Sequence, residues 1–512
     1  MVALAGADTD RLLGPWGVGG EAPDDAYDQG GDIVGDRGLW LDSNDPIAHA
    51  IVESLLRGSI GADGLRFQSA FESDGDPHTI TPDERKTRNK INRSIRRACT
   101  GTRFDANGLL SRVEMSKIIA RQAICTGSGF AQKLWLPNRQ GAQYQATCWR
   151  LIHASRVCNP DYAPNSERWV NGFRLDDNGQ PIAVGVLKHH PRAMLGKAQW
   201  VTVPIYLPDG ARNLVYLPSH TAPDQIRGPG WFNQVIPLLR FIGRTMEAKV
   251  IADLMKASIG FIIECDNPTA MAAQDRNGTE LTKATKIKPG MKYYVKKGTN
   301  WKEFNLNFNG ADFNQWGDFL LKLVCANFGM PWQFVMQQLT NSNMASARVA
   351  LAQAYQTFNG LATWMIDYVE DPWNHSIIAE DIVRGRIEIG TAELDDAYMG
   401  RYLLPPRPMP NPLQDAQTAV IKNQQLGYSL NTLHGDAGSN LEEEANAAPG
   451  ERDLLQRNGV RIVPMGGTPA TIPGDDSTDD TTGDNEPKPE ESPARRVPEP
   501  SNMNAPAKIP AP

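Results

Sequence analysis

Several kinds of segment are missing from this 512-residue sequence. No apolar run reaches the roughly 20 residues that a helical membrane span requires, so we expect no membrane partner. The first twenty residues carry Asp8, Asp10 and Arg11 where a secretory signal would have a basic start and an apolar middle. This pattern predicts that the chain is not exported.

Cysteines at metal-binding or redox spacing are missing as well. The six cysteines lie far apart in the sequence, and none of them forms a CxxC pair. Such usage is typical of a reducing compartment in which the thiols stay free and mostly buried. We therefore expect no disulfide framework.

The motifs of the common enzyme classes do not occur. Gly196-Lys197 lacks the upstream glycine and the following Ser or Thr of a phosphate-binding loop, there is no HExxH, and Thr126-Gly127-Ser128-Gly129 fits neither GxGxxG nor GxSxG. His189 and His190 are adjacent, but a metal site would need a third ligand at suitable spacing. We interpret them as ordinary loop or strand-end histidines. The sequence predicts no catalytic residue, no cofactor and no metal ion.

Positive charge is in deficit, since the formal net charge is −7. This balance argues against a general nucleic-acid coat protein, although an acidic lining suits a passage to which DNA must not adhere. Basic residues nevertheless cluster in a predicted helix from Arg85 to Arg97. Such a helix either contacts nucleic acid or an acidic partner, or is a solvated basic face. The lack of interleaved aromatic residues favours the solvated face.

The strongest positive signal is a long helical pattern from Trp231 to Ile259. Its apolar residues recur in steps of three and four and so share one face. They are Val235, Leu238, Leu239, Ile242, Met246, Val250 and Leu254. A second helical pattern follows from about Ala311 to Phe328, after a lysine-rich, strand-like segment. This pair is either an internal hairpin of a helical domain or a subunit element that packs against copies of itself.

The remaining chain reads as α+β, mainly α. Alternating and apolar runs between Phe130 and Leu217 are separated by turns such as Asp177-Asn178-Gly179, which predicts strands. The breaker cluster Arg227-Gly228-Pro229-Gly230 predicts a hinge into the long helix. Beyond Pro464 the sequence is rich in Asp, Thr, Pro and Glu and poor in apolar residues, so it should be disordered.

Several segments, in the same order, resemble the portal proteins of tailed bacteriophages of the lambda type. DPIAHAIVESLLRGSIGADGLRFQ is similar to the opening helix of that family, and GPGWFNQVIPLLRFIGRTMEAKVIADLMKASIGFII is similar to its long stem helix. Asn343 to Leu351 is similar to the pattern N-Y-S-S-A-R-x-A-L, with Met344 in place of Tyr and Ala345 in place of the first Ser. Each motif is weak alone, but their order and spacing cover roughly residues 41 to 462.

The resemblance implies a portal fold of wing, stem, clip and crown that forms a ring with a central channel. The implied division is a flexible N-terminal arm (1–40), an α+β wing (41–227), a first stem helix (228–259), a clip (260–310), a second stem helix (311–330), a tunnel loop (331–345), a long helix that completes the wing (346–404), a crown (405–465) and a disordered tail (466–512).

The resemblance also implies the partners. They are further copies of the chain, about twelve in a closed cyclic ring, double-stranded DNA in the channel, the terminase, the head–tail adaptor and the major capsid protein. The protein would lie at the portal vertex of the virion, and in the host cytoplasm during assembly. The tunnel-loop residues expected to face DNA are Gln337, Gln338, Thr340, Asn341, Ser342 and Asn343. The lysines expected to dock partners or steer DNA at the clip are Lys283, Lys286, Lys288, Lys292, Lys296 and Lys297.

Two other functions remain as alternatives. A hydrolase or nuclease of the packaging apparatus would need a metal–carboxylate or phosphate-binding site, for which the sequence has no motif. A monomeric or dimeric helical adaptor without a channel would need no ring at all. The mass of the protein in solution separates that adaptor from a portal.

Overall fold

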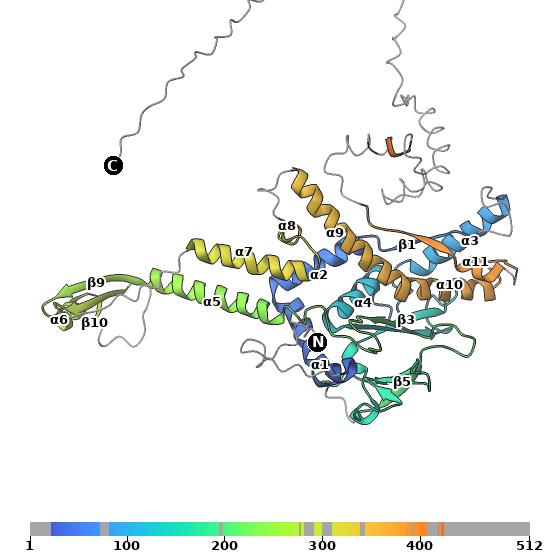
Figure 1. The fold of residues 1–512 in the computed structure, drawn as a ribbon, viewed down its shortest axis with the longest axis horizontal. Coiled ribbons are helices and arrows are strands. Elements are labelled where there is room, and N and C mark those ends of the chain that lie inside the picture. The colour runs from blue at the N-terminus through green and yellow to red at the C-terminus, as the bar shows by residue number, and fades with distance from the viewer. Residues whose placement is uncertain are drawn as a thin grey trace, which may run out of the picture. The chain divides into compact units, whose positions relative to one another are not determined.

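The computed structural model describes residues 22–71, 81–193, 198–275, 278–280, 291–298, 310–337, 344–390, 393–406, 418 and 421–423. All of them belong to one compact unit, Met1–Asn446. Mixed helices and strands make up this unit, in agreement with the predicted α+β class (Figure 1). Its longer helices are α1 (Pro23–Asn44), α2 (Pro46–Ser59), α3 (Pro82–Cys99), α4 (Arg112–Thr126), α5 (Ile236–Ser258), α7 (Gly310–Asn327), α9 (Met344–Met365) and α10 (Asp371–Val383).

One large core joins segments that are far apart in the sequence. It takes apolar side chains from α2, α4, α9 and α10 and from the first residues of α5. The two-stranded sheet of β1 (Arg66–Ser69) and β12 (Gly400–Leu403) packs at its side, with Phe67 and Tyr402 edge to face at 5.4 Å. Phe104, Trp149 and Trp373 are fully buried at its centre. The helices on both sides of the α5–α7 segment thus fold into one body.

A second, smaller core lies between two antiparallel sheets. One sheet has the order β3-β2-β8, with strands Thr147–Ile152, Ser128–Trp135 and Leu214–Pro218. The other has the order β4-β5-β6-β7, with strands Trp169–Val170, Phe173–Leu175, Pro181–Leu187 and Trp200–Pro204. Phe130, Phe173 and Tyr216 fill the space between the sheets, with ring centroids 4.8 to 6.0 Å apart. The strands predicted between Phe130 and Leu217 are therefore present.

Helix α1 corrects the prediction of a flexible arm over residues 1–40, which is wrong from Pro23 onward. The helix packs along α4 and buries Tyr27 and Leu41. Its glycines make this approach possible, since a Cβ on Gly38 would lie 2.3 Å from the carbonyl oxygen of Cys125. Glycine is a poor helix former, so the local sequence argued against a helix that is stabilised by tertiary contacts, above all with α4.

The predicted hinge at residues 227–230 is a tightly packed connection. Arg227 is buried; its Nε donates to Ser128 Oγ (3.1 Å), and its Nη1 donates to the carbonyl of Val157 (3.0 Å). A Cβ on Gly230 would lie 2.1 Å from the carbonyl oxygen of Cys125. The glycines therefore serve close packing at this position, and the start of the long helix is held firmly on α4.

Helices α9 and α10 are joined through a π-helical turn, Ile366–Glu370. Pro372 in the first turn of α10 explains the turn, because proline has no N–H to donate and its ring clashes with the carbonyl four residues earlier. The amide of Asp371 instead bonds to the carbonyl of Ile366, five residues back. The π turn directs the side chain of Glu370 into the core, where it is almost fully buried.

Glu370 forms a buried ion pair with α4. Its Oε2 accepts from Arg112 Nη2 and its Oε1 accepts from Ser116 Oγ, both at 2.5 Å. Arg112 Nη1 lies 3.1 Å from Cys99 Sγ, and the guanidinium also faces the ring of Phe104. Burial lowers the pKa of Arg112, but the neighbouring Cys99 and Glu370 together outweigh it, so the pKa is raised. This pair locks the π turn to the end of α3 and the start of α4.

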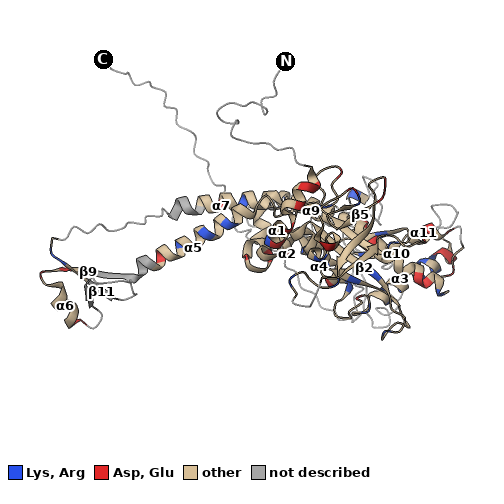
Figure 2. Ribbon diagram, turned by 90° about the horizontal axis from the view of Figure 1, so that it is seen from below, with Lys and Arg blue, Asp and Glu red and all other residues tan. Residues whose placement is uncertain are grey.

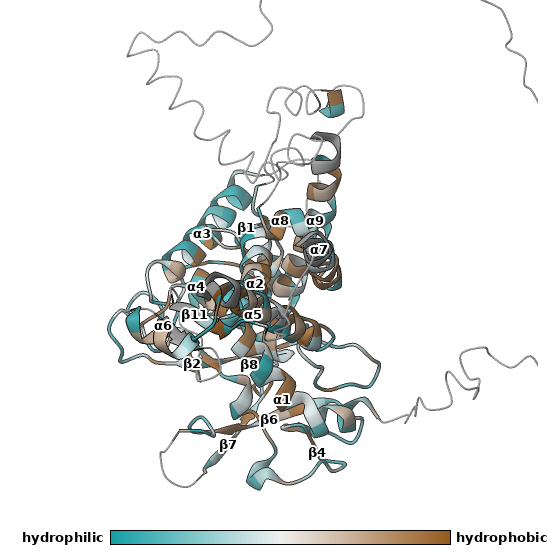
Figure 3. Ribbon diagram, turned by 90° about the vertical axis from the view of Figure 1, so that its left-hand side faces the viewer, coloured by the Kyte–Doolittle hydropathy of each residue, from teal (hydrophilic) through white to brown (hydrophobic). Residues whose placement is uncertain are grey.

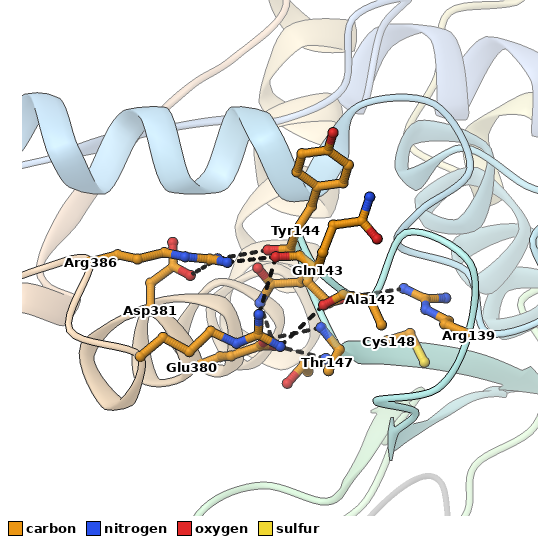
Figure 4. Close-up of polar contacts among 12 residues, drawn as sticks. Arg139, Ala142, Gln143, Tyr144, Thr147, Cys148, Glu380, Asp381 and Arg386 are labelled. Carbon is orange, nitrogen blue, oxygen red and sulfur yellow. Dashed lines mark hydrogen bonds and ion pairs between the residues drawn. The ribbon is translucent and has the colours of Figure 1, made fainter.

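Two further carboxylates of α10 anchor the loop between β2 and β3 and the helix α3 (Figure 4). Glu380 accepts hydrogen bonds from the amides of Ala146 and Thr147 (2.8 Å each) and from Gln145 Nε2 (2.7 Å). Asp381 accepts from Ser94, Arg97 and Arg386. Both carboxylates are buried and held by several donors, which is the condition under which buried charge is tolerated.

The basic residues of α3 are therefore partly structural. Arg88 is buried and its Nε donates to the carbonyl of Phe71 (2.7 Å), while Arg97 pairs with Asp381 and Lys90 lies 3.3 Å from Glu388. The expectation of a wholly solvated basic face is wrong for Arg88 and Arg97, whereas Lys90 is exposed, as expected. Arg93 on the same helix is exposed.

The Arg112–Glu370 pair gives a stability prediction. Glu370→Leu leaves the buried guanidinium without its carboxylate and should cost about 3–5 kcal/mol, whereas the double variant Arg112→Met/Glu370→Leu should recover most of this loss. Urea unfolding of both variants measures the difference. A double variant no more stable than the single one would contradict the assigned role of the pair.

A second prediction concerns pH. Burial lowers the pKa of His153, helped by His190, and burial also lowers the pKa of His375. Both imidazoles are therefore harder to protonate in the folded protein than in the unfolded chain, which takes up protons near pH 6.5. The melting temperature should therefore fall between pH 7 and pH 5.5. His153→Gln/His375→Gln should flatten this dependence, and an unchanged slope would contradict it.

Candidate functional site on the α5–α7 hairpin

Helices α5 and α7 pack against each other and leave the body as a pair. Their bases are fixed: Phe232 and Phe328 meet edge to face at 5.0 Å, and Asn327 Nδ2 donates to the carbonyl of Trp231 (3.2 Å). Gly329 ends α7 with φ 62°, and its carbonyl accepts from Thr357 Oγ1 on α9 (2.8 Å). Pro237 falls in the first turn of α5, where proline is tolerated because the N–H groups of the first turn have no partner within the helix.

The apolar face predicted for α5 is covered over only part of its length. Val235, Leu239 and Ile242 are buried in the core. Further along the same face, Met246, Val250 and Leu254 are 50%, 57% and 61% exposed. We call these three residues the α5 stripe. The covered side of the outer half of α5 instead runs through Thr245, Lys249 and Ala252, a spacing that rotates it away from the stripe.

Helix α7 carries a matching exposed row. Trp316, Phe319 and Leu323 follow at three- and four-residue spacing, and their side chains are 57%, 53% and 45% exposed. The rings of Trp316 and Phe319 stack at 5.7 Å. We call these residues the α7 stripe. The neighbouring side of the helix, with Leu320, Val324 and Phe328, is buried. Apolar residues therefore lie on two sides of α7, and α5 covers only one.

A third face of α5 is polar. Arg240, Arg244 and Glu247 follow at the same spacing and are exposed, and Lys and Arg appear along α5 in Figure 2. Among the described residues none of the three has an ion-pair partner within 4.0 Å. The hairpin thus presents apolar stripes and a charged face in different directions.

The segment after α5 forms a small parallel sheet. Its order is β10-β11-β9, with strands Gly278–Glu280, Met291–Lys296 and Ile259–Cys265, and the short helix α6 (Pro268–Gln274) precedes β10. Tyr294 donates to Asp275 Oδ2 (2.9 Å). Parallel sheets are normally covered on both faces, yet α6 is the one helix of this module in the part of the chain that the structure describes.

The predicted site residues are placed only in part. Lys296 and Lys297 are exposed at the end of β11, and Lys292 lies within that strand. Lys283, Lys286 and Lys288 lie outside the described residues. Gln337 is exposed just after the short helix α8 (Trp332–Val335), with φ 53°. The remaining predicted tunnel-loop residues, 338–343, also lie outside the described part.

The described ranges contain neither a metal-binding cluster nor a membrane-spanning helix. His190 lies 4.9 Å from His153, ring centroid to ring centroid, but no three metal-binding side chains come together in the described chain. None of the described helices combines the length and the apolar character of a membrane span.

Comparison with known proteins decides the family. Residues 9–361 match the family described as "Phage portal protein, lambda family". The chain belongs to this family. It is a portal protein, and portal proteins are structural components of phage virions. The match ends within α9, so α10 and its carboxylate network lie beyond it.

A distant similarity is also found among solved structures. A chain of the "Virion of native gene transfer agent (GTA) particle" aligns with a TM-score of 0.43 and 11% identity, over 84% of this portal chain and 98% of that chain. No curated protein matches the sequence.

The sequence itself contains a signal for the α7 stripe. Trp316, Phe319 and Leu323 have the same three- and four-residue spacing as the α5 face. What the sequence could not show is that α5 covers the other side of α7, which leaves these residues exposed.

Proposed function

We propose that the chain assembles into a closed ring at one capsid vertex, through which the genome is packaged and ejected. The observation that supports this is the pair of apolar stripes on α5 and α7. Exposed apolar residues are common singly, but rows of large ones on a helix pair are typical of protein interfaces. A structural portal that conducts DNA has a use for such rows, because its helices must pack between subunits.

The two stripes suit a head-to-tail contact. The α7 stripe of one copy packs on the α5 stripe of the next, so that each subunit uses two different surfaces. Such a heterologous contact closes into a ring when the rotation between subunits fits. About twelve copies form the ring, as in the architecture expected of this family.

The charged face of α5 is the candidate channel lining. Once the stripes are buried between subunits, Arg240, Arg244 and Glu247 remain on a solvent-facing side. Mixed charge at this face contacts a polyanion without holding it firmly, since each added cation would increase salt-dependent affinity for DNA. The polar residues from Gln337 to Asn343, of which only Gln337 is described, are the candidate tunnel loop that faces DNA.

The small parallel sheet is the candidate docking module. Lys296 and Lys297 present positive charge at its end, on a protein of net charge −7. This local patch suits an acidic surface of the terminase during packaging and of the head–tail adaptor afterwards. The major capsid protein surrounds the wing. No observation favours hydrolase or nuclease activity over this role.

A charged residue introduced into the α5 stripe or the α7 stripe tests whether these stripes form the subunit interface of the ring. Val250→Asp should remove a buried apolar contact worth about 2–3 kcal/mol from every subunit interface and so weaken association roughly 100-fold. Light scattering after size exclusion should then show monomers at micromolar concentration, where the unaltered protein forms rings. Phe319→Asp should act in the same way.

The matched control is Val383→Asp, at a valine on α10 that is 87% exposed and outside the hairpin. It should assemble normally. Circular dichroism of all variants checks that the body remains folded. Rings of normal mass for both Val250→Asp and Phe319→Asp would overturn the proposed interface.

Deletion of Gln337–Asn343 tests the DNA role separately. Because the stripes are untouched, ring mass should be unchanged, while the yield of packaged DNA in an assembly assay should fall. Normal packaging by this deletion would contradict a role of the loop at DNA, and the ring would be unaffected by that result.

A further inference from the structure

The edge strand β7 of the four-stranded sheet is covered by the described chain only at Pro204, whose carbonyl accepts from Asn213 Nδ2, and it is open over Trp200 and Thr202. At β3, the amide and carbonyl of Trp149 bond to the carbonyl of Phe104 and the amide of Ala106. At β4, Trp169 bonds to Ser166 through both backbone groups. At β8, the carbonyl of Pro218 accepts from Trp364 Nε1. Each of these edges is thus at least partly occupied by the chain itself.

Strand β7 has no such cover over Trp200 and Thr202. The amide of Lys188 donates to the carbonyl of Gln199, and the amide of Ile205 donates to the carbonyl of Ile182. In this register the backbone N–H and C=O groups of residues 199, 201, 203 and 205 point toward β6. The backbone groups of Trp200 and Thr202 consequently point away from the sheet. Within the described ranges, nothing bonds to them on that side. Figure 3 shows β7, β6 and β4 together at one end of the protein.

The side chains of β7 leave this edge unprotected. Natural edge strands usually carry charges that prevent pairing with other chains, but Trp200-Val201-Thr202-Val203-Pro204 carries none. Val201 is 51% exposed although it lies on the core side of the sheet with Val203. On the opposite side, Tyr162 stacks edge to face on Trp200 at 5.1 Å and is itself exposed.

Positive charge gathers where β7 begins. Arg156 donates to the carbonyls of Leu187 and Lys188, and Lys188 Nζ bonds to Gln199 Oε1 (3.3 Å). In the described part of the chain neither residue, nor Arg150 beside them, has a carboxylate within ion-pair distance. Partial burial and the charge of Arg150 lower the pKa of Arg156, which reflects this excess of positive charge.

We propose that the β7 edge binds an extended segment of another protein as an added strand, with carboxylates at the segment's C-terminal end. An antiparallel partner places that end beside Trp200, next to Arg156 and Lys188. Main-chain hydrogen bonds to Trp200 and Thr202 give the affinity. The selectivity comes from an apolar side chain that covers Val201 and from carboxylates that pair with Arg156 and Lys188.

A second copy of β7 is a poorer occupant. In an antiparallel pair centred on Thr202, Pro204 of one copy would lie opposite Trp200 of the other. Pro204 has no N–H to donate, and its carbonyl already accepts from Asn213 Nδ2 (2.9 Å). The chemistry of the edge therefore favours a different protein, and the site is independent of the α5 and α7 stripes.

The test uses the full-length protein and a fluorescent peptide, acetyl-Thr-Val-Thr-Val-Glu-Glu-amide. Anisotropy should show saturable binding to the unaltered protein. Thr202→Pro removes the outward amide while the bonds to β6 remain, so affinity should fall at least tenfold with little change in melting temperature. Thr202→Val keeps the amide and should bind within twofold of the unaltered protein. Equal binding by Thr202→Pro would overturn the proposal.

Two peptide controls and one exchange measurement complete the test. A peptide N-methylated at alternate residues, and one with Lys-Lys in place of Glu-Glu, should both bind at least tenfold more weakly. In the unaltered protein, the peptide should slow hydrogen exchange at the amide of Thr202. This measurement does not depend on whether any variant folds. No slowing, or a Thr202→Cys variant that forms disulfide-linked dimers in preference to binding peptide, would contradict the assigned occupant.

Discussion

Three buried carboxylates hold the body of this portal protein together, and all three lie on the consecutive helical segments formed by the π turn and α10. Glu370 on the π turn, and Glu380 and Asp381 on α10, reach back to α4, to the loop before β3 and to α3. Their partners lie more than 200 residues earlier in the chain. Because a buried charge without a partner costs several kcal/mol, these contacts favour one arrangement of the π turn and α10 against α3, α4 and the loop before β3.

The α5–α7 hairpin is attached rigidly to the body, which fixes the direction in which its stripes are presented. The bases of α5 and α7 are fixed by Phe232, Phe328 and Gly329, and the connection at Gly230 leaves no space for a side chain. The stripes on the outer part of the hairpin are therefore presented in a constant direction. A ring requires this constancy, because small errors in the angle between subunits would add up around the circle.

In its described part, the same body carries two kinds of exposed surface. The stripes are apolar side-chain surfaces, which suit repeated contacts between identical subunits. The β7 edge offers main-chain donors and acceptors beside positive charge, which suits an extended segment of another protein. Under the two proposals made above, ring assembly and partner binding use different residues and do not compete.

The spacing of apolar residues was enough to predict both hairpin helices, and the order of weak motifs was enough to indicate the family. The sequence could not show α1, since the glycines that disfavour a helix locally are needed for its contact with α4. Nor could it show which half of the α5 face is exposed, or that Arg112 meets Glu370 across 258 positions. Those features depend on which distant segments pack together, and periodicity along one helix carries no record of its neighbours.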